Sequence, residues 1–290
     1  MFGTSGVRGR VGEQITADLA LAVGRALATS GADRVVVGRD ARSSGEFLGS
    51  ALEAGLRECG CDVVAVGRAS TPAVARAVGT RDADAGVMLT ASHNPPEDNG
   101  IKLWNPSGQA FDEAQRAEIT RLVDRDSYEF RSWDSLGGYA EWDGAESTHR
   151  DALVATGRDL SGLSVVVDVG NGMGGVTVDA LYELGADVST LNAREDGRFP
   201  GRPSEPTAET CSDLCASTAA SDADLGIAHD GDADRMMAVD EDGSFLEGDT
   251  LLALFGRRAA TSGDRVAAPL NTSLAVDDAL SSVGASVTRT

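Results

Sequence analysis

The segment Asp-Gly-Asp-Ala-Asp-Arg at residues 230–235 carries the most distinctive chemistry in the sequence. On an extended segment, carboxylates at i, i+2 and i+4 project to one side, where their mutual repulsion is costly without a cation. Hard carboxylate oxygens favour magnesium or calcium. We exclude an EF-hand because Arg235 stands where that loop requires glycine, and because both flanks are predicted strands. The spacing therefore predicts a metal site at Asp230, Asp232 and Asp234, with a solvated acidic turn as the alternative.

A second candidate site follows the apolar segment 85–89, where Thr-Ala-Ser-His-Asn-Pro-Pro occupies residues 90–96. The two prolines prevent a regular continuation of the strand. Ser92 is therefore expected on a stiff loop at the carboxyl end of a strand, where open α/β sheets bind ligands. His93 beside it could transfer a proton or bind a phosphate. The segment has no Gly-x-Ser-x-Gly elbow, so a hydrolase triad is not supported, and an ordinary turn is the alternative.

The glycine-rich segment Gly-Asn-Gly-Met-Gly-Gly at 170–175 lies between a predicted strand and a predicted helix. It formally satisfies the pattern of a dinucleotide-binding loop, which makes a nicotinamide-dependent oxidoreductase an alternative function. The next predicted strand ends in Leu-Asn-Ala at 191–193, without an acid at the ribose position. We favour a tight structural turn.

The N-terminal segment Phe-Gly-Thr-Ser-Gly-Val-Arg-Gly at 2–9 is a candidate anion site. Its glycines free the backbone to approach an anion, and Thr4, Ser5 and Arg8 offer hydrogen-bond donors for a phosphate. A flexible terminus is the alternative.

Helical and strand periodicities alternate along the whole chain, which predicts an α/β fold. Apolar spacing at 16–29 predicts a helix with Thr16 as its N-cap. Short apolar strands separated by helices are typical of parallel sheets with both faces covered. Strand–helix–strand openings near residues 35, 165 and 266 predict three similar domains, which we place at 1–145, 146–243 and 244–290. The third contains one such unit only, so the chain is expected to be truncated at its C-terminal end.

The amino-acid composition argues against several classes of protein, among them nucleic-acid-binding and membrane proteins. The 290 residues carry 25 basic and 46 acidic side chains, a net charge of −21, which disfavours binding to nucleic acid. Apolar runs are far shorter than the ~18 residues that span a bilayer, and the N-terminus has no signal core, so we expect a cytoplasmic protein without a membrane partner. The acidic excess and a single lysine among the basic residues indicate a halophilic composition. The four cysteines lack zinc spacing and are expected to be small buried thiols.

Together and in this order, the four motifs resemble the α-D-phosphohexomutase superfamily, which includes phosphoglucomutase, phosphomannomutase and phosphoglucosamine mutase. The segments that carry the resemblance are 2–9, 90–102, 167–175 and 230–235. The resemblance covers essentially the whole chain. It implies repeated α/β domains with mixed or parallel sheets, two complete and a third only begun. It also implies interconversion of hexose 1-phosphates and hexose 6-phosphates of mannose, glucose or glucosamine.

The resemblance implies a role for each motif. Ser92 would carry the transferable phosphoryl group, and its phosphate would join Asp230, Asp232 and Asp234 as a ligand of magnesium. The side chains around that phosphate would be Arg8, His93, Lys102 and Arg235. Lys102 is the only lysine, and a lysine can act in acid–base chemistry, whereas an arginine effectively cannot. The cofactor would be Mg²⁺, the partner a small phosphosugar, and a hexose 1,6-bisphosphate both activator and intermediate.

A full enzyme of this family has four domains, of which the third supplies a sugar-recognition loop and the fourth a phosphate-binding loop. Neither loop is expected within this chain, which is therefore expected to keep the magnesium site while interconverting hexose phosphates at most marginally. A non-catalytic fragment or paralogue, which would bind magnesium without turnover, is the second alternative beside the oxidoreductase.

Overall fold

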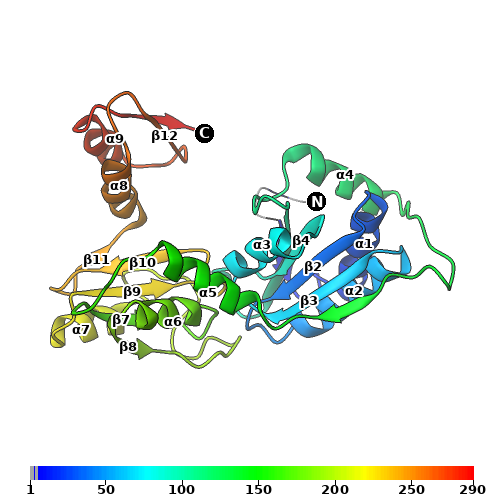
Figure 1. Cartoon of the computed structure of the whole chain (residues 1–290), viewed down its shortest axis with the longest axis horizontal. Coiled ribbons are helices and arrows are strands. Elements are labelled where there is room, and N and C mark those ends of the chain that lie inside the picture. The colour runs from blue at the N-terminus through cyan, green and yellow to red at the C-terminus, as the bar shows by residue number, and fades with distance from the viewer. Residues whose placement is uncertain (1–2, 4–5) are drawn as a thin grey trace.

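The computed structural model describes residue 3 and residues 6–290, which form three α/β units in chain order (Figure 1). The first unit lies at the right of Figure 1, the second at the lower left and the small third unit above the second. The predicted α/β class, with two complete units and a smaller third, is confirmed. No helix of the described part of the chain is both long and apolar enough to cross a membrane.

The first unit is built on a six-stranded mixed sheet. Its strands, in spatial order, are β1 (Val7–Arg10), β5 (Asp98–Trp104), β4 (Ala85–Leu89), β2 (Arg34–Arg39), β3 (Asp62–Arg68) and β6 (Tyr139–Glu141). Strand β5 runs in the opposite direction to the other strands of this sheet, and it pairs antiparallel with both β1 and β4. The carboxyl ends of β2, β3 and β4 therefore share one edge of the sheet, from which the segments 40–44 and 90–97 emerge.

Helices cover both faces of this sheet. On one face lie α1 (Ala17–Thr29), α2 (Gly45–Glu58) and α4 (Glu113–Asp124), and on the other face lies α3 (Thr71–Thr80). The predicted N-cap of α1 is confirmed, since the Thr16 side chain accepts a hydrogen bond from the Leu19 amide. Helices α1 and α2 approach so closely at Gly24 and Gly55 that an added Cβ would lie 2.2 Å from a backbone oxygen of the other helix.

The second unit has a five-stranded sheet. Its order is β11 (Phe245–Leu246), β10 (Met236–Val239), β9 (Leu225–His229), β7 (Ser164–Asp168) and β8 (Asp187–Leu191). Strands β7, β8 and β9 are parallel, and β10 returns antiparallel beside β9. Helices α6 (Gly175–Glu183) and α7 (Ser212–Ala220) pack on opposite faces. The acidic segment 230–235 therefore forms the turn between β9 and β10.

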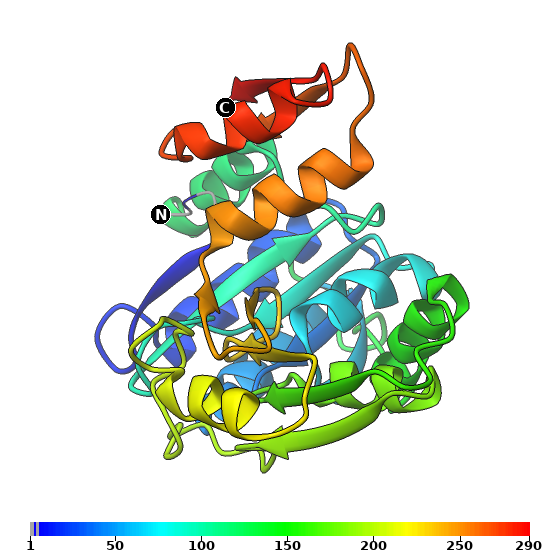
Figure 2. The same cartoon turned by 90° about the vertical axis from the view of Figure 1, so that its left-hand side faces the viewer.

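Helix α5 (Ala145–Thr156) joins the first two units and packs against both α3 and α6, as Figure 1 shows. The third unit contains α8 (Gly248–Ala259), β12 (Arg265–Ala268), α9 (Leu274–Ser281) and β13 (Ser286–Arg289), with β12 and β13 parallel. Figure 2 shows α8, in orange, between the second unit and the rest of the third unit. The domain limits at 145 and 243 stay predictions.

Candidate active site

Ser92 is fully buried in the loop that follows β4, at the edge of the first sheet. Its backbone is left-handed, with φ 56°, a conformation that a non-glycine residue keeps only when its surroundings hold it there. The Ser92 amide donates to Thr90 Oγ1 over 2.8 Å. Its hydroxyl donates to Asp230 Oδ2 over 2.6 Å, so two motifs 138 residues apart in the sequence meet at this bond.

The acidic segment after β9 gathers its three carboxylates, but on a turn in which Ala233 is left-handed, with φ 56°, and not on the extended backbone that the spacing argument assumed. One oxygen from each of Asp230, Asp232 and Asp234 lies within 4.8 Å of the others. Asp230 and Asp232 are buried, and Asp232 Oδ1 finds no hydrogen-bond partner among the described residues. A buried carboxylate oxygen without a donor, beside two further carboxylates, fits a hard divalent cation such as magnesium.

Burial and the close approach of three carboxylates shift the pKa values of the aspartates in this turn. Burial and the charges of Asp232 and Asp234 raise the pKa of Asp230 to about 7. Burial also opposes ionisation of Asp232, yet the Lys102 ammonium and hydrogen bonds from Lys102 and Thr71 hold its pKa below the ordinary range. The site therefore binds positive charge more readily than a solvated acidic turn would.

Lys102 reaches the acidic turn from β5, the antiparallel strand of the first sheet. Its Nζ lies 2.7 Å from Asp232 Oδ2 and 2.7 Å from Asp234 Oδ2, and its side chain is 7% exposed. Thr71, at the start of α3, donates to the same Asp232 oxygen over 2.6 Å. The single lysine of the chain is thus an ion-pair partner of the predicted metal ligands. An ammonium has three N–H donors, so one remains for a further acceptor.

Cationic side chains line a cavity of about 170 Å³ beside this ion pair. Its lining includes Arg8, Lys102, Arg235, Asp234 and Trp104. Within the described part of the chain, the buried Arg8 Nε and Trp104 Nε1 both lack a hydrogen-bond acceptor. Unpaired donors and an excess of positive charge make this cavity suited to an anion.

The other predicted site residues are His93, Arg8, Thr4 and Ser5. His93 Nδ1 lies 3.4 Å from Ser92 Oγ, and burial together with the nearby Arg235 charge lowers the pKa of His93, which favours the neutral imidazole. Burial likewise lowers the pKa of Arg8, against the attraction of the acidic turn. Thr4 and Ser5 lie outside the described residues.

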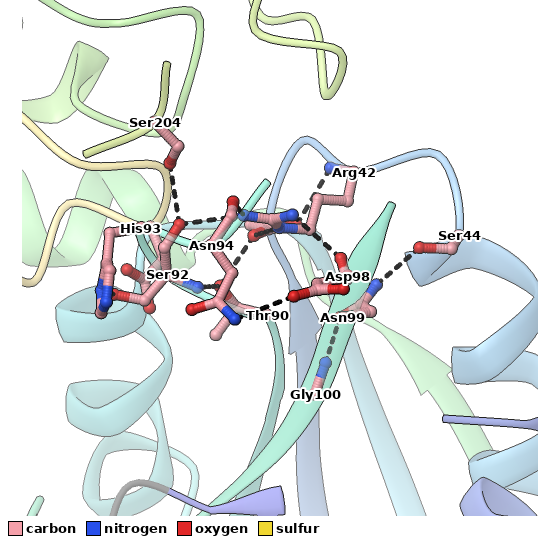
Figure 3. A network of polar contacts seen from close by, with 12 residues as sticks. Arg42, Ser44, Thr90, Ser92, His93, Asn94, Asp98, Asn99, Gly100 and Ser204 are labelled. Atoms are coloured by element: carbon pink, nitrogen blue, oxygen red, sulfur yellow. Dashed lines mark hydrogen bonds and ion pairs between the residues drawn. The ribbon is translucent and has the colours of Figure 1, made fainter. Parts of the chain in front are cut away.

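The sequence reasoning did not identify several buried residues that support the two loops. Asp40 and Arg42, which follow β2, form hydrogen bonds to the segment 90–97 that carries Ser92, which we call the serine loop; Figure 3 shows these bonds for Arg42. His229 supports the acidic turn: its Nδ1 donates to the Arg235 carbonyl, and its Nε2 accepts from Thr177, both over 2.8 Å. The signal available for Asp40 was its position directly after an apolar strand, at the edge where Ser92 was expected.

The glycine segment 170–175 packs against the acidic turn. A Cβ on Gly172 would lie 2.6 Å from the Gly231 carbonyl oxygen, and the Met173 amide donates to that oxygen over 3.1 Å. A Cβ on Gly170 would lie 2.6 Å from the Arg202 guanidinium. These glycines allow close approach of protein to protein, which supports the structural-turn interpretation over a dinucleotide cradle.

Comparison with known families tests the resemblance of the four motifs. The model described as "Phosphoglucomutase/phosphomannomutase, alpha/beta/alpha domain I" matches residues 1–129, and that for domain II matches residues 148–243. The chain belongs to the phosphoglucomutase/phosphomannomutase family. This family membership confirms the predicted phosphohexomutase-type fold and decides against the nicotinamide-dependent alternative.

Individual members of the phosphoglucomutase/phosphomannomutase family cover the whole chain. Two proteins named "Probable phosphoglucosamine mutase", from Methanosarcina acetivorans and Methanococcoides burtonii, are 47% and 45% identical to it. Each alignment covers 100% of this chain and 66% of the relative. A solved family protein from Burkholderia thailandensis is 30% identical, with a TM-score of 0.88, and again the match covers 100% of this chain and 66% of that one. The chain thus spans 66% of the length of these relatives.

Proposed function

We propose that this protein is a phosphohexomutase that moves a phosphoryl group between the 1- and 6-oxygens of a hexose, with Ser92 as the carrier. The observation that supports this most directly is the hydrogen bond of 2.6 Å from the Ser92 hydroxyl to Asp230. This bond lies in a site that contains both the carboxylates of the acidic turn and the cationic side chains of the adjoining cavity. Phosphoryl transfer depends mainly on positioning and charge neutralisation, which such a site supplies.

The chemistry needs one covalent exchange at Ser92. When a hexose bisphosphate phosphorylates the serine, a bond forms between Ser92 Oγ and phosphorus, and the bond from phosphorus to the sugar oxygen breaks. The serine hydroxyl loses its proton, and the released sugar oxygen takes up a proton to become a hydroxyl, so the exchange balances. Asp230 accepts a hydrogen bond from this hydroxyl in the resting site and so orients it toward the acidic turn. Lys102 and Arg8 line the adjoining cavity, where their N–H groups can bind phosphoryl oxygens.

Magnesium is the cofactor we propose, with Asp230, Asp232 and Asp234 as its protein ligands. The unpartnered Asp232 Oδ1 and the hard oxygen donor set support this choice over a softer metal. Bound there, the ion would offset negative charge on the phosphoryl oxygens. The phosphate on Ser92 would add a further oxygen ligand.

Glucosamine phosphate is the substrate we favour among the hexose phosphates. The support is that relatives 41–47% identical to this chain are named "Probable phosphoglucosamine mutase". The motifs themselves fit mannose, glucose and glucosamine phosphates alike, so this assignment rests on the relatives.

The proposal can be tested on residues 1–290 by measuring one step alone, the phosphorylation of Ser92. We expect that incubation with glucose 1,6-bisphosphate and Mg²⁺ adds one phosphoryl group, seen by intact mass and mapped to Ser92 by peptide sequencing. Ser92→Ala is the matched control and should stay unmodified. Wild-type protein that remains unmodified, or a phosphate mapped to Thr90 or Ser5, would contradict the proposed role of Ser92.

A further inference from the structure

Arg42 is a fully buried arginine whose guanidinium is surrounded by carbonyl groups of the serine loop. Its Nη2 donates to the carbonyl oxygens of Ser92, over 3.0 Å, and Asn94, over 2.6 Å. Its Nη1 donates to the Asp98 carbonyl over 2.9 Å and also to that of Pro95. Three carbonyls of this loop, together with that of Asp98 at the start of β5, therefore point at one side chain; Figure 3 shows Arg42 beside Ser92, Asn94 and Asp98. Buried carbonyls need donors, and Arg42 supplies them.

A closed cycle of hydrogen bonds joins Arg42 to the backbone of Ser92. Arg42 Nε pairs with Asp40 Oδ2 at 3.0 Å, and neither side chain is exposed. The same Asp40 oxygen accepts from Thr90 Oγ1 over 2.7 Å, and Thr90 Oγ1 accepts from the Ser92 amide. The cycle fixes both the amide and the carbonyl of Ser92, which are the two groups that define its left-handed conformation.

The second unit closes over this cluster. The Phe199 ring centroid lies 5.0 Å from Arg42 Cζ, and Ser204 Oγ donates to the Ser92 carbonyl over 2.8 Å. Gly197 approaches so closely that a Cβ there would lie 2.4 Å from Arg42 Cα. The Ser92 carbonyl thus accepts from both units, and the serine loop is held from both sides.

We propose that Arg42 is a positioning residue for the phosphoryl carrier, which it serves by holding Ser92 so that its hydroxyl points at the acidic turn. The proposal rests on the proposed function of Ser92. All the hydrogen bonds of the Arg42 side chain go to the backbone or to Asp40, so it acts through the loop and does not touch the transferred group. A lysine would keep the charge but could not present donors in the planar fork that four separated carbonyls require.

Arg42→Lys and Arg25→Lys form a matched pair for the test. Arg25 also pairs with a carboxylate, Glu58, but it lies on α1, away from the serine loop.

We would measure single-turnover phosphorylation by glucose 1,6-bisphosphate over a range of concentrations, and amide hydrogen exchange of residues 92–98. For Arg42→Lys we expect the maximal rate to fall about a hundredfold, because a misplacement of about 1 Å has that effect. The half-saturating concentration should stay within threefold of wild type, and exchange at 92–98 should accelerate, while Arg25→Lys matches wild type in all three.

The outcomes separate the positioning role from the proposed function. An Arg42→Lys protein that matches Arg25→Lys in both rate and exchange would overturn the inference. A loss that appears only in the half-saturating concentration would also overturn it, since that result belongs to a group in contact with the ligand. If wild type is never phosphorylated, the proposed function fails, and the exchange comparison still decides whether Arg42 holds the loop.

A second variant covers the case in which Arg42→Lys does not fold. Thr90→Val keeps the shape of the buried side chain and removes the hydroxyl that links Asp40 to the Ser92 amide. We expect the same signature in a weaker form, a loss of about tenfold in maximal rate with faster exchange at 92–98. Wild-type values for Thr90→Val would then contradict the proposal.

Discussion

Replacing Lys102 with methionine tests how strongly the two units depend on the ion pair between them. Lys102 Nζ lies 2.7 Å from Asp232, whose side chain is fully buried, and 2.7 Å from Asp234, which is 28% exposed. Methionine keeps an unbranched apolar side chain but lacks the terminal ammonium, so the buried Asp232 carboxylate loses its counter-charge. Breaking a buried pair from one side costs about 3–5 kcal/mol of unfolding free energy. We expect a loss in that range.

The assay is urea unfolding at pH 7, followed by far-UV circular dichroism, for wild type, Lys102→Met, Asp232→Asn and the double variant. Because the cost comes from an unpaired charge, the double variant should lose less than the two single variants added together. Arg121→Met is the control, since its ion pair with Glu118 is exposed and its loss should leave the midpoint unchanged. A loss below about 1 kcal/mol for Lys102→Met, the range of an exposed pair, would refute the reasoning, as would strict additivity in the cycle.

Four further predictions address the metal, the packing, the thiols and the surface charge. Asp232→Asn should weaken Mg²⁺ binding at least tenfold by calorimetry, because it removes the charge of the carboxylate with the free oxygen; unchanged affinity would place the ion elsewhere. Gly55→Ala should cost about 1–3 kcal/mol in urea unfolding, because its Cβ would lie 2.2 Å from the Leu21 carbonyl oxygen, whereas Gly175→Ala, whose Cβ meets no described atom, should be nearly neutral. Burial raises the pKa of Cys61 to about 12, so iodoacetamide at pH 8 should label it only after unfolding, and rapid native labelling would count against this. Raising KCl from about 0.1 to about 1 M should raise the thermal midpoint, because the Debye length shortens from about 10 to about 3 Å around a chain of charge −21; a midpoint that falls would argue against the halophilic interpretation.

The sequence by itself determined the local structure and most of the chemistry. The continuous valines of β2 and β7 predicted buried strands, and the cap at Thr16 predicted where α1 begins, because these signals depend on neighbours within a few residues. The spacing of Asp230, Asp232 and Asp234 predicted a cluster of carboxylates. The extended backbone assumed for it was wrong, since the segment is a turn in which Ala233 has a φ of 56°. The family resemblance then joined the serine and acidic motifs into one site.

Only the tertiary structure decided which residues hold that site together. Nothing in the sequence pairs Lys102 with Asp232, 130 residues away, or Thr71 with the same carboxylate. Arg42 has an ordinary sequence context, and its importance comes from backbone carbonyls that lie 50 to 56 residues later in the chain. Hydrogen bonds of this kind depend on where two sheet edges meet, which is set by the packing of whole helices and strands, so no local pattern encodes them.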